Sequence, residues 1–214
     1  ECHESTGVHR TSGRVYKFSH TPREDATPKN LLSTDLNARS SVELAELIKH
    51  QNSWFVRQAR LILAQRASND ETKSTKDFQS AVVNLIKTLN DDSPELVYRA
   101  LTTLSVMGLA DDELLRSRLT HSDEHIRAWA IRLISDHWPI DDVFGPNFVS
   151  QQKRSRVGDE YLRWNDSFCD LAAKDPSGLV RLTLASTIQR LPVKYRCALA
   201  TALMSRAEDA DDHN

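Results

Sequence analysis

The chain has 214 residues, of which 39% are hydrophobic, so it can bury a sizeable core. Its 28 Lys and Arg residues against 30 Asp and Glu residues leave a formal net charge of -2. This balance argues against a protein that binds nucleic acid or an anionic membrane through a dominant basic surface. No apolar run in the sequence approaches the roughly 18 residues of a membrane helix, so membrane insertion is not expected.

Residues 1–20 differ in pattern from everything that follows. Within them the segment GRVYKFS alternates and is rich in β-formers, which predicts a short strand. Because a lone strand is not stable, we expect this segment to be the end of a preceding β-domain. Pro22, Pro28 and their polar neighbours then indicate an extended linker over residues 21–39.

Helical periodicity begins at Ser40, which forms an S-x-x-E capping box with Glu43. A second helix follows the break near Asn52, and the next is predicted to begin with a box made by Ser74 and Asp77. The apolar stripes of these three helices contain Leu44, Leu47 and Ile48, then Phe55, Ala59, Ile62 and Leu63, and then Phe78, Ala81, Val82, Leu85, Ile86 and Leu89. They define one helix pair and begin a second.

The partner of the third helix has clear signals at both ends. Ser93 is a suitable N-cap, Pro94 suits the first helical position, and Gly108 suits the left-handed conformation that closes a helix. A third pair combines a short helix over residues 111–120 with the helix in SDEHIRAWAIRLISDHW, residues 122–138. The apolar stripe of that second helix contains Ile126, Trp129, Ala130, Leu133 and Ile134.

An inserted loop of irregular structure is predicted over residues 139–157, which contain Pro, Gly and a charged run. Helices resume over residues 159–174. Asp175 is predicted to cap the helix that follows, with Pro176 in its first turn. Pro192 then begins a further helix.

Together, residues 40–207 predict an all-α fold, an irregular HEAT- or armadillo-like α-solenoid of antiparallel helix pairs. A short extended or β segment precedes this array, and residues 208–214 form a polar tail. An arginine recurs near the start of each second helix, at intervals that scatter around the roughly 40–47 residues of HEAT and armadillo repeats. These arginines are Arg57, Arg99, Arg127 and Arg181.

The four arginines have two interpretations. Solenoids present extended concave faces, so a row of arginines on such a face would suit phosphate groups. However, acidic residues precede the helix starts, namely Asp92, Asp123, Glu124 and Asp175. We therefore favour a ladder in which the arginine of one repeat pairs with an acid in the loop of the adjacent repeat.

The pattern H-x-x-E-H from His121 to His125 matches that of inverted zinc peptidases. Zinc binding would need both histidines on one helical face, but Ser122 is predicted to cap the helix and to leave His121 outside it. A loop-to-helix junction is therefore favoured over a metal site. Further candidate ligands near the start of the chain are Cys2, His3 and His9. Their spacing fits no standard zinc module, so a metal is not expected there either.

The remaining cysteines and the tryptophans are predicted to be structural. Cys169 and Cys197 lie in helical stretches beside apolar residues, where a thiol usually serves as a small buried group. Three tryptophans stand at helical spacing next to Leu and Ile, which favours the core over a ligand-stacking surface. They are Trp54, Trp129 and Trp164. Trp138, beside Pro139, is assigned to neither.

Four segments give the chain a resemblance to a known family. They are, in order, ECHESTGVHRTSGRVYKFSH, WFVRQARLILAQRA, HIRAWAIRLISDH and VRLTLASTIQRLPVKYRCALATALMSRAEDADD. The chain resembles the middle of the large membrane-bound dehydrogenases of planctomycetes and verrucomicrobia, in which a β-propeller precedes HEAT repeats and a cytochrome c-like module with a CxxCH haem motif. The resemblance implies that residues 1–20 close the propeller, that the repeats continue past Asn214, and that the protein is periplasmic or belongs to the cell envelope. Haem is implied only outside this chain, which contains no CxxCH.

Neither the residues nor the resemblance assigns a catalytic, cofactor or metal site to the chain, so it is not expected to be an enzyme itself. The first hypothesis is a non-catalytic HEAT-like scaffold or interaction segment of a multidomain dehydrogenase, with the propeller and the cytochrome-like module as its partners. One alternative is a nucleic-acid-binding enzyme of the alkylpurine DNA glycosylase type, against which the net charge of -2 argues. The other is a stand-alone module that binds other proteins.

Overall fold

The computed structural model describes residues 35–138 and 160–210, and all regular secondary structure within these two ranges is helical. The described residues from Leu36 onward belong to one compact unit. Three expectations fall outside the described ranges and stay predictions: the strand in residues 1–20, most of the linker over residues 21–39, and the loop over residues 139–157. None of the helices within the described ranges combines the length and the apolar character needed to cross a membrane.

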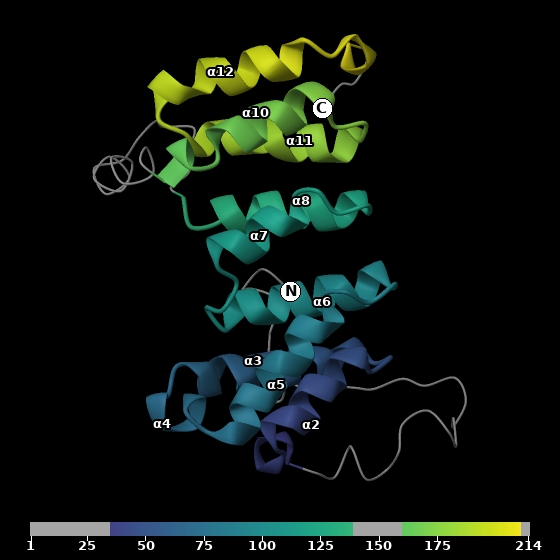
Figure 1. Cartoon of the computed structure of the whole chain (residues 1–214). Coiled ribbons are helices and arrows are strands. Elements are labelled where there is room, and N and C mark those ends of the chain that lie inside the picture. The colour runs from purple at the N-terminus through teal and green to yellow at the C-terminus, as the bar shows by residue number, and fades with distance from the viewer. Residues whose placement is uncertain (1–34, 139–159, 211–214) are drawn as a thin grey trace, which may run out of the picture. The chain divides into compact units, whose positions relative to one another are not determined.

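The helices pack in pairs that follow one another along the chain (Figure 1). Each pair has a first and a second helix: α2 (Ser41–Glu46) with α3 (Ser53–Ala67), α5 (Lys76–Thr88) with α6 (Pro94–Val106), α7 (Asp112–Arg118) with α8 (Glu124–Ser135), and α10 (Asn165–Lys174) with α11 (Gly178–Thr187). A further helix, α12 (Val193–Met204), packs on both α10 and α11. The all-α prediction with paired helices is therefore confirmed for the described residues.

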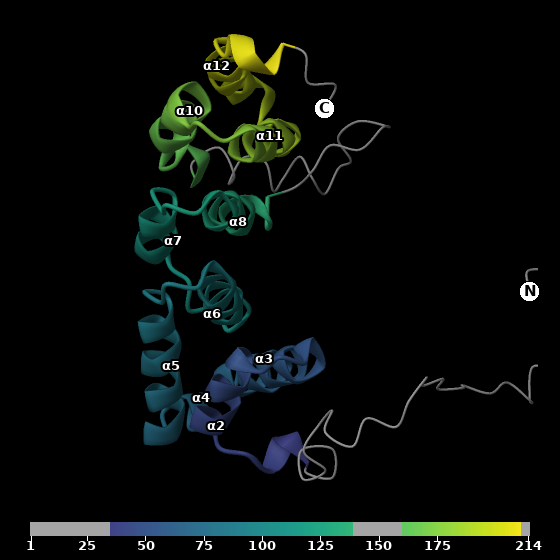
Figure 2. The same ribbon diagram turned by 90° about the vertical axis from the view of Figure 1, so that its right-hand side faces the viewer.

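The helices lie in two layers. In Figure 2 the second helices α3, α6, α8 and α11 lie on one side, and the first helices α5, α7 and α10 lie on the other. Each second helix contacts the next one along the chain, so the pairs are joined into one stack. Short helices connect or extend the main ones, namely η2 (Leu36–Ala38), η3 (Leu47–Lys49), α4 (Asp70–Lys73), η4 (Ile188–Arg190) and η5 (Ala207–Asp209).

The apolar stripes of the two layers meet in a continuous core. Five residues that were predicted to lie on the apolar stripes are almost completely buried, namely Phe55, Leu63, Phe78, Leu85 and Ile126. Full burial of a side chain of this size stabilises the fold by about 1.5–3 kcal/mol, which explains why the amphipathic helices pair. The stack is therefore held mainly by the residues that recur at helical spacing.

The start of α2 matches the predicted capping box. The Ser40 hydroxyl accepts a hydrogen bond from the Glu43 amide at 3.1 Å, and Glu43 Oε2 accepts one from the Ser40 amide at 2.9 Å. Just before it, residues expected to be extended form the 3-10 helix η2, which contacts α3 and buries the Leu36 side chain. The last residues of the predicted linker are thus part of the folded unit, because Leu36 is apolar and finds a covered site.

The capping box predicted at Ser74 and Asp77 is wrong. α5 is capped by Thr75, whose hydroxyl accepts a hydrogen bond from the Phe78 amide at 3.2 Å. Ser74 instead ends the short helix α4, where its hydroxyl donates to the Asp70 carbonyl. The Asp77 carboxylate therefore does not turn back to its own helix start and is available to a neighbouring helix.

Two other predicted caps lie close to the true ones. α8 begins after Asp123, not Ser122, and the Asp123 carboxylate accepts hydrogen bonds from the first amides of that helix. α11 begins after Ser177, whose hydroxyl accepts from the Val180 amide at 3.3 Å, and Asp175 ends the preceding helix instead. In both places two polar residues compete for the cap, and local sequence does not decide between them.

The Asp77 carboxylate caps a different helix, α2. Its Oδ2 atom accepts a hydrogen bond from the Ser41 amide at 2.6 Å, and its Oδ1 atom accepts one from the Val42 amide at 3.3 Å. Partial burial raises the pKa of the Asp77 carboxyl, but these hydrogen bonds and the charge of Arg66 outweigh burial and hold the pKa below its ordinary value. The contact joins the first helices of two consecutive pairs.

Replacement of Asp77 by Asn is expected to lower the free energy of unfolding by about 1 kcal/mol at pH 7, because a charged helix cap is lost. The pKa is depressed in the folded protein, so this stabilisation is fully present above the ordinary value of 3.8 and is lost as the pH falls through the lower folded value. Urea unfolding followed by circular dichroism at a series of pH values measures both effects.

The variant should therefore lose less stability on acidification than the unchanged chain. Asp92→Asn is the matched control, since Asp92 is exposed. Equal acid sensitivity of the Asp77→Asn variant and the unchanged chain would contradict the cap.

Candidate functional site

Arg127, on the first turn of α8, is buried at the junction of two consecutive pairs. Its Nε and Nη2 atoms donate to the two carboxylate oxygens of Asp175 at 2.8 and 2.9 Å, which is a bidentate ion pair. Its Nη1 atom donates to the carbonyls of His121 and Ser122 at 2.8 and 2.9 Å. The hydrogen bond to Asp175 is the main cause that raises the pKa of Arg127 above its already high value. One guanidinium thus holds its own interhelix turn and the turn of the next pair.

Arg181 occupies the corresponding place on α11. Its Nη1 atom donates to the Asp175 carbonyl at 2.7 Å, while Nε and Nη2 both donate to the Asp209 carboxylate. These bonds hold the pKa of the Asp209 carboxyl below its ordinary value. Asp175 is therefore shared, since its carboxylate binds Arg127 and its carbonyl binds Arg181. We call Arg127, Asp175, Arg181 and Asp209 the arginine–aspartate network of the stack.

The other two arginines of the predicted ladder behave differently. Arg99 reaches back to the preceding pair, where its Nη1 atom donates to the Ile48 and His50 carbonyls at 2.9 Å each, and it also binds Glu95 of its own helix. Arg57 is exposed, and its hydrogen bond is to the Ser53 hydroxyl at 3.5 Å. The structure thus brings Arg127 and Arg181 together with acids and leaves Arg57 at the surface.

Further arginines bind the carbonyl groups at the ends of neighbouring helices, where the helix dipole favours a cation. Arg118 donates to the Leu89 carbonyl at 2.9 Å, and Arg206 donates to the Ala173 carbonyl at 2.7 Å. Arg190 binds the Asp136 carbonyl in the same way. Sequence analysis missed these contacts. Arg118 and Arg190 lie in the last turn of a helix, a common position for a cation, but nothing local indicates that the carbonyls belong to another pair.

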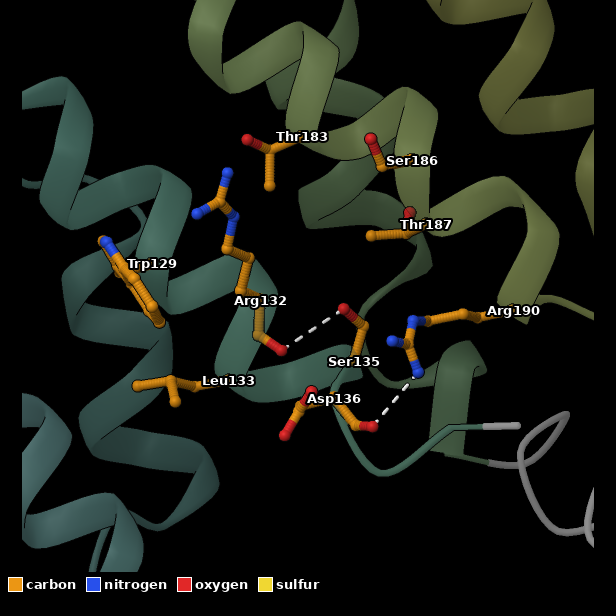
Figure 3. Close-up of a pocket in the computed structure, with 9 residues that line it drawn as sticks. All are labelled: Trp129, Arg132, Leu133, Ser135, Asp136, Thr183, Ser186, Thr187 and Arg190. Carbon is orange, nitrogen blue, oxygen red and sulfur yellow. Dashed lines mark hydrogen bonds between the residues drawn. The ribbon is translucent and has the colours of Figure 1, made fainter. Parts of the chain in front are cut away.

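A groove lies between the second helices α8 and α11 (Figure 3). It has a volume of about 420 Å³ and is lined by Trp129, Arg132, Leu133, Ser135, Asp136, Thr183, Ser186, Thr187 and Arg190. The wall from α8 carries the aromatic ring and one cation, and the wall from α11 carries mostly hydroxyl groups. Arg190 fixes one end of the groove, because its Nη1 atom donates to the Asp136 and Trp138 carbonyls at 3.1 and 2.6 Å.

Trp129 is the ridge between this groove and a second depression beside α6. Its ring is half-buried, with its centroid 5.0 Å from that of Tyr98, and the guanidinium carbon of Arg132 lies 5.2 Å from the ring centroid. The Arg132 side chain is exposed and has no acidic partner among the described residues. Trp129 is therefore not the core residue that its spacing predicts, because it lies at the edge of the apolar stripe.

The other tryptophans divide between core and surface. Trp164 is buried as predicted, and Trp138, which sequence analysis left unassigned, is 1% exposed. The prediction for Trp54 is wrong, since this side chain is 47% exposed. It precedes the first buried turn of α3 and packs edge-on against the neighbouring Phe55 ring.

The two histidines of the zinc-like pattern do not share a helix. His121 precedes α8, and its Nδ1 atom accepts a hydrogen bond from the Asp123 amide at 3.0 Å, while His125 lies inside the helix and is exposed. Within residues 35–138 and 160–210 there is no cluster of three or more His, Cys, Asp or Glu residues that could hold a metal ion. The candidate ligands Cys2, His3 and His9 lie outside the described residues.

The cysteines are only partly as predicted. Cys169 is half-buried, and burial raises the pKa of its thiol, which opposes the formation of a nucleophilic thiolate. Cys197 is exposed on α12, so the expectation of a buried apolar thiol is wrong there.

Comparisons with known proteins add little to this picture. No protein-family model matches the chain, and no curated protein matches it. A crystal structure of an engineered protein is similar to the chain at 18% sequence identity, with a TM-score of 0.36. The matched region covers 76% of this chain and 67% of the engineered protein. Similarity at that level establishes neither a shared fold nor a shared function. The fold class rests on the helices of this chain, and the resemblance to the dehydrogenase family stays a prediction.

Proposed function

We propose that the chain is a non-catalytic HEAT-like scaffold, an α-solenoid segment that links the propeller and the cytochrome c-like module of a larger dehydrogenase. The observation that supports this proposal is the arginine–aspartate network formed by Arg127, Asp175, Arg181 and Asp209. A segment that fixes the distance between two domains needs repeats that do not slide or open. The buried bidentate pair of Arg127 with Asp175, and the partly exposed pair of Arg181 with Asp209, meet that need. The family assignment within the proposal rests on the sequence resemblance.

The alternative use of the arginines, to read phosphate groups, is disfavoured by their geometry. Arg127 is 8% exposed and Arg181 is 5% exposed, and both guanidinium groups already bind carboxylates and carbonyls. A phosphate would have to displace these partners from a buried site. A DNA glycosylase of the HEAT-like type would then depend on other residues, and the groove that contains Trp129 and Arg132 is the place where it would find them.

The proposal is tested on the purified chain and on its parent reading frame. We expect a helical circular dichroism spectrum, no absorbance from haem or nucleotide, and less than stoichiometric metal. A stoichiometric cofactor would contradict the scaffold function. A parent frame without a propeller before Glu1 and without a CxxCH motif after Asn214 would contradict the dehydrogenase assignment.

The DNA-binding alternative has its own measurement. Affinity for duplex DNA at physiological salt, with a steep decrease as salt rises, would favour the glycosylase type over the scaffold. Binding that is too weak to measure under those conditions would support the scaffold.

A further inference from the structure

The groove between α8 and α11 contains hydrogen-bonding capacity that the rest of the described residues do not use. Arg132 lies along the face of the Trp129 ring, and its guanidinium extends toward the Thr183 side of the groove (Figure 3). Arg190 uses only its Nη1 atom in hydrogen bonds to the other described residues. The α8 wall and the end of the groove at Arg190 therefore present guanidinium N–H groups, which prefer carboxylate or phosphate oxygens.

The hydroxyl groups of the α11 wall indicate which further groups a ligand of this groove would need. Thr183, Ser186 and Thr187 donate their protons to carbonyls of their own helix at 2.7, 2.9 and 2.7 Å. A hydroxyl that donates still has lone pairs that accept. Thr183 and Thr187 are each 3% exposed, so the acceptor that this wall offers to a ligand is the hydroxyl of the exposed Ser186. The Asp136 carboxylate, which also lines the groove, is another acceptor. A ligand that fits both walls carries N–H donors as well as anionic oxygens.

A peptide with acidic side chains has both kinds of group, because its backbone supplies N–H donors at regular intervals. A phosphodiester backbone offers oxygen acceptors but has no N–H donor. The exposed edge of Trp129 adds an apolar surface for one aliphatic or aromatic side chain. The volume of about 420 Å³ lies within the range of about 300–1,000 Å³ that is usual for ligand pockets.

We propose that this groove binds an extended acidic peptide segment of a partner protein or domain. Carboxylates of the segment pair with Arg132 and Arg190, and a backbone amide donates to the Ser186 hydroxyl of α11. An apolar side chain between the acids packs on Trp129. This proposal rests on the proposed function as an interaction scaffold, since it names the chemistry of one partner.

The test measures fluorescence anisotropy of a labelled peptide in which Asp and Glu residues flank one Leu. Binding should weaken as salt rises, and a peptide with Asn and Gln in place of the acids should lose it. Arg132→Gln should weaken binding about 10-fold, because one charge-assisted hydrogen-bonding group is removed. Arg57→Gln, which changes an exposed arginine on α3 outside the groove, should leave binding unchanged.

Each outcome decides between the alternatives. An affinity that is equal in the Arg132→Gln and Arg57→Gln variants, or tighter for duplex DNA than for the peptide, would overturn the peptide groove. Circular dichroism and cofactor content are measured on the same samples. A helical, cofactor-free chain that does not bind the peptide refutes the groove alone, whereas bound haem or metal refutes the scaffold function itself.

Discussion

Arg127→Ala is expected to lower the free energy of unfolding by about 3–5 kcal/mol. The substitution leaves the Asp175 carboxylate, whose side chain is 3% exposed, without its bidentate partner. It also leaves two carbonyls of the turn before α8 without their donor. Removal of one member of a buried ion pair is costly mainly because the other charge remains buried and uncompensated. Urea unfolding at pH 7, followed by circular dichroism, measures the effect.

A double variant separates the buried charge from the lost packing. In Arg127→Ala with Asp175→Asn the charge is gone, while the Asn oxygen can still accept the hydrogen bond that Asp175 accepts from the Ser177 amide. The double variant should therefore be more stable than Arg127→Ala alone, and the Asp175→Asn single variant completes the double-mutant cycle that gives the coupling energy. Arg57→Ala, at an exposed position, should change stability by less than about 0.5 kcal/mol. A cost below about 1 kcal/mol for Arg127→Ala would refute its role in the stack.

Trp138→Ala is expected to be about as destabilising, at about 3–5 kcal/mol, because it opens a cavity in the core. The ring is 1% exposed, its centroid lies 5.9 Å from that of Tyr161 and 6.2 Å from that of Phe168, and its Nε1 atom donates to Glu160. These contacts join the end of α8 to the helices of the next pair. The same urea unfolding experiment measures the loss.

Trp129→Ala is the matched comparison for this prediction. Its spacing alone suggests a core truncation of similar cost, but the ring is half-buried and faces a groove. We expect a loss of about 1–2 kcal/mol, from partial burial and the contact with Tyr98. If Trp129→Ala destabilised the chain as much as Trp138→Ala, the assignment of Trp129 to a binding surface would be wrong.

The sequence was sufficient for the helices because their apolar residues repeat within a few positions. Leu63 and Leu85 could be assigned to the core because a residue and its neighbours one turn away share a face. The same signal does not locate the edge of a stripe, where side chains are covered by some neighbours and not by others. Trp54 and Trp129 lie at such edges, and their burial is set by which helices pass beside them.

The type of interaction at the candidate site could be predicted from the sequence, but most of its partners could not. The number of arginines and acids near helix starts suggested ion pairs between repeats, but the partner of Arg127 depends on how far one pair is rotated against the next. Asp175 was expected both to cap a helix and to belong to the acids of the ladder. Ser177 is the true cap, and the Asp175 carboxylate binds Arg127. The groove could not be predicted at all, because the residues on its two walls come together only through the packing of α8 on α11.

The shared use of Asp175 has a consequence for how the stack opens. In a repeat array, stability is the sum of the terms within each repeat and the coupling between neighbours. Arg127 and Arg181 meet at one residue, so α8, α11 and η5 are strongly coupled. Between α3 and α6 the Arg60 guanidinium donates to the uncharged Thr103 hydroxyl at 3.3 Å. The part from α8 to η5 should therefore exchange its amide hydrogens as one cooperative unit.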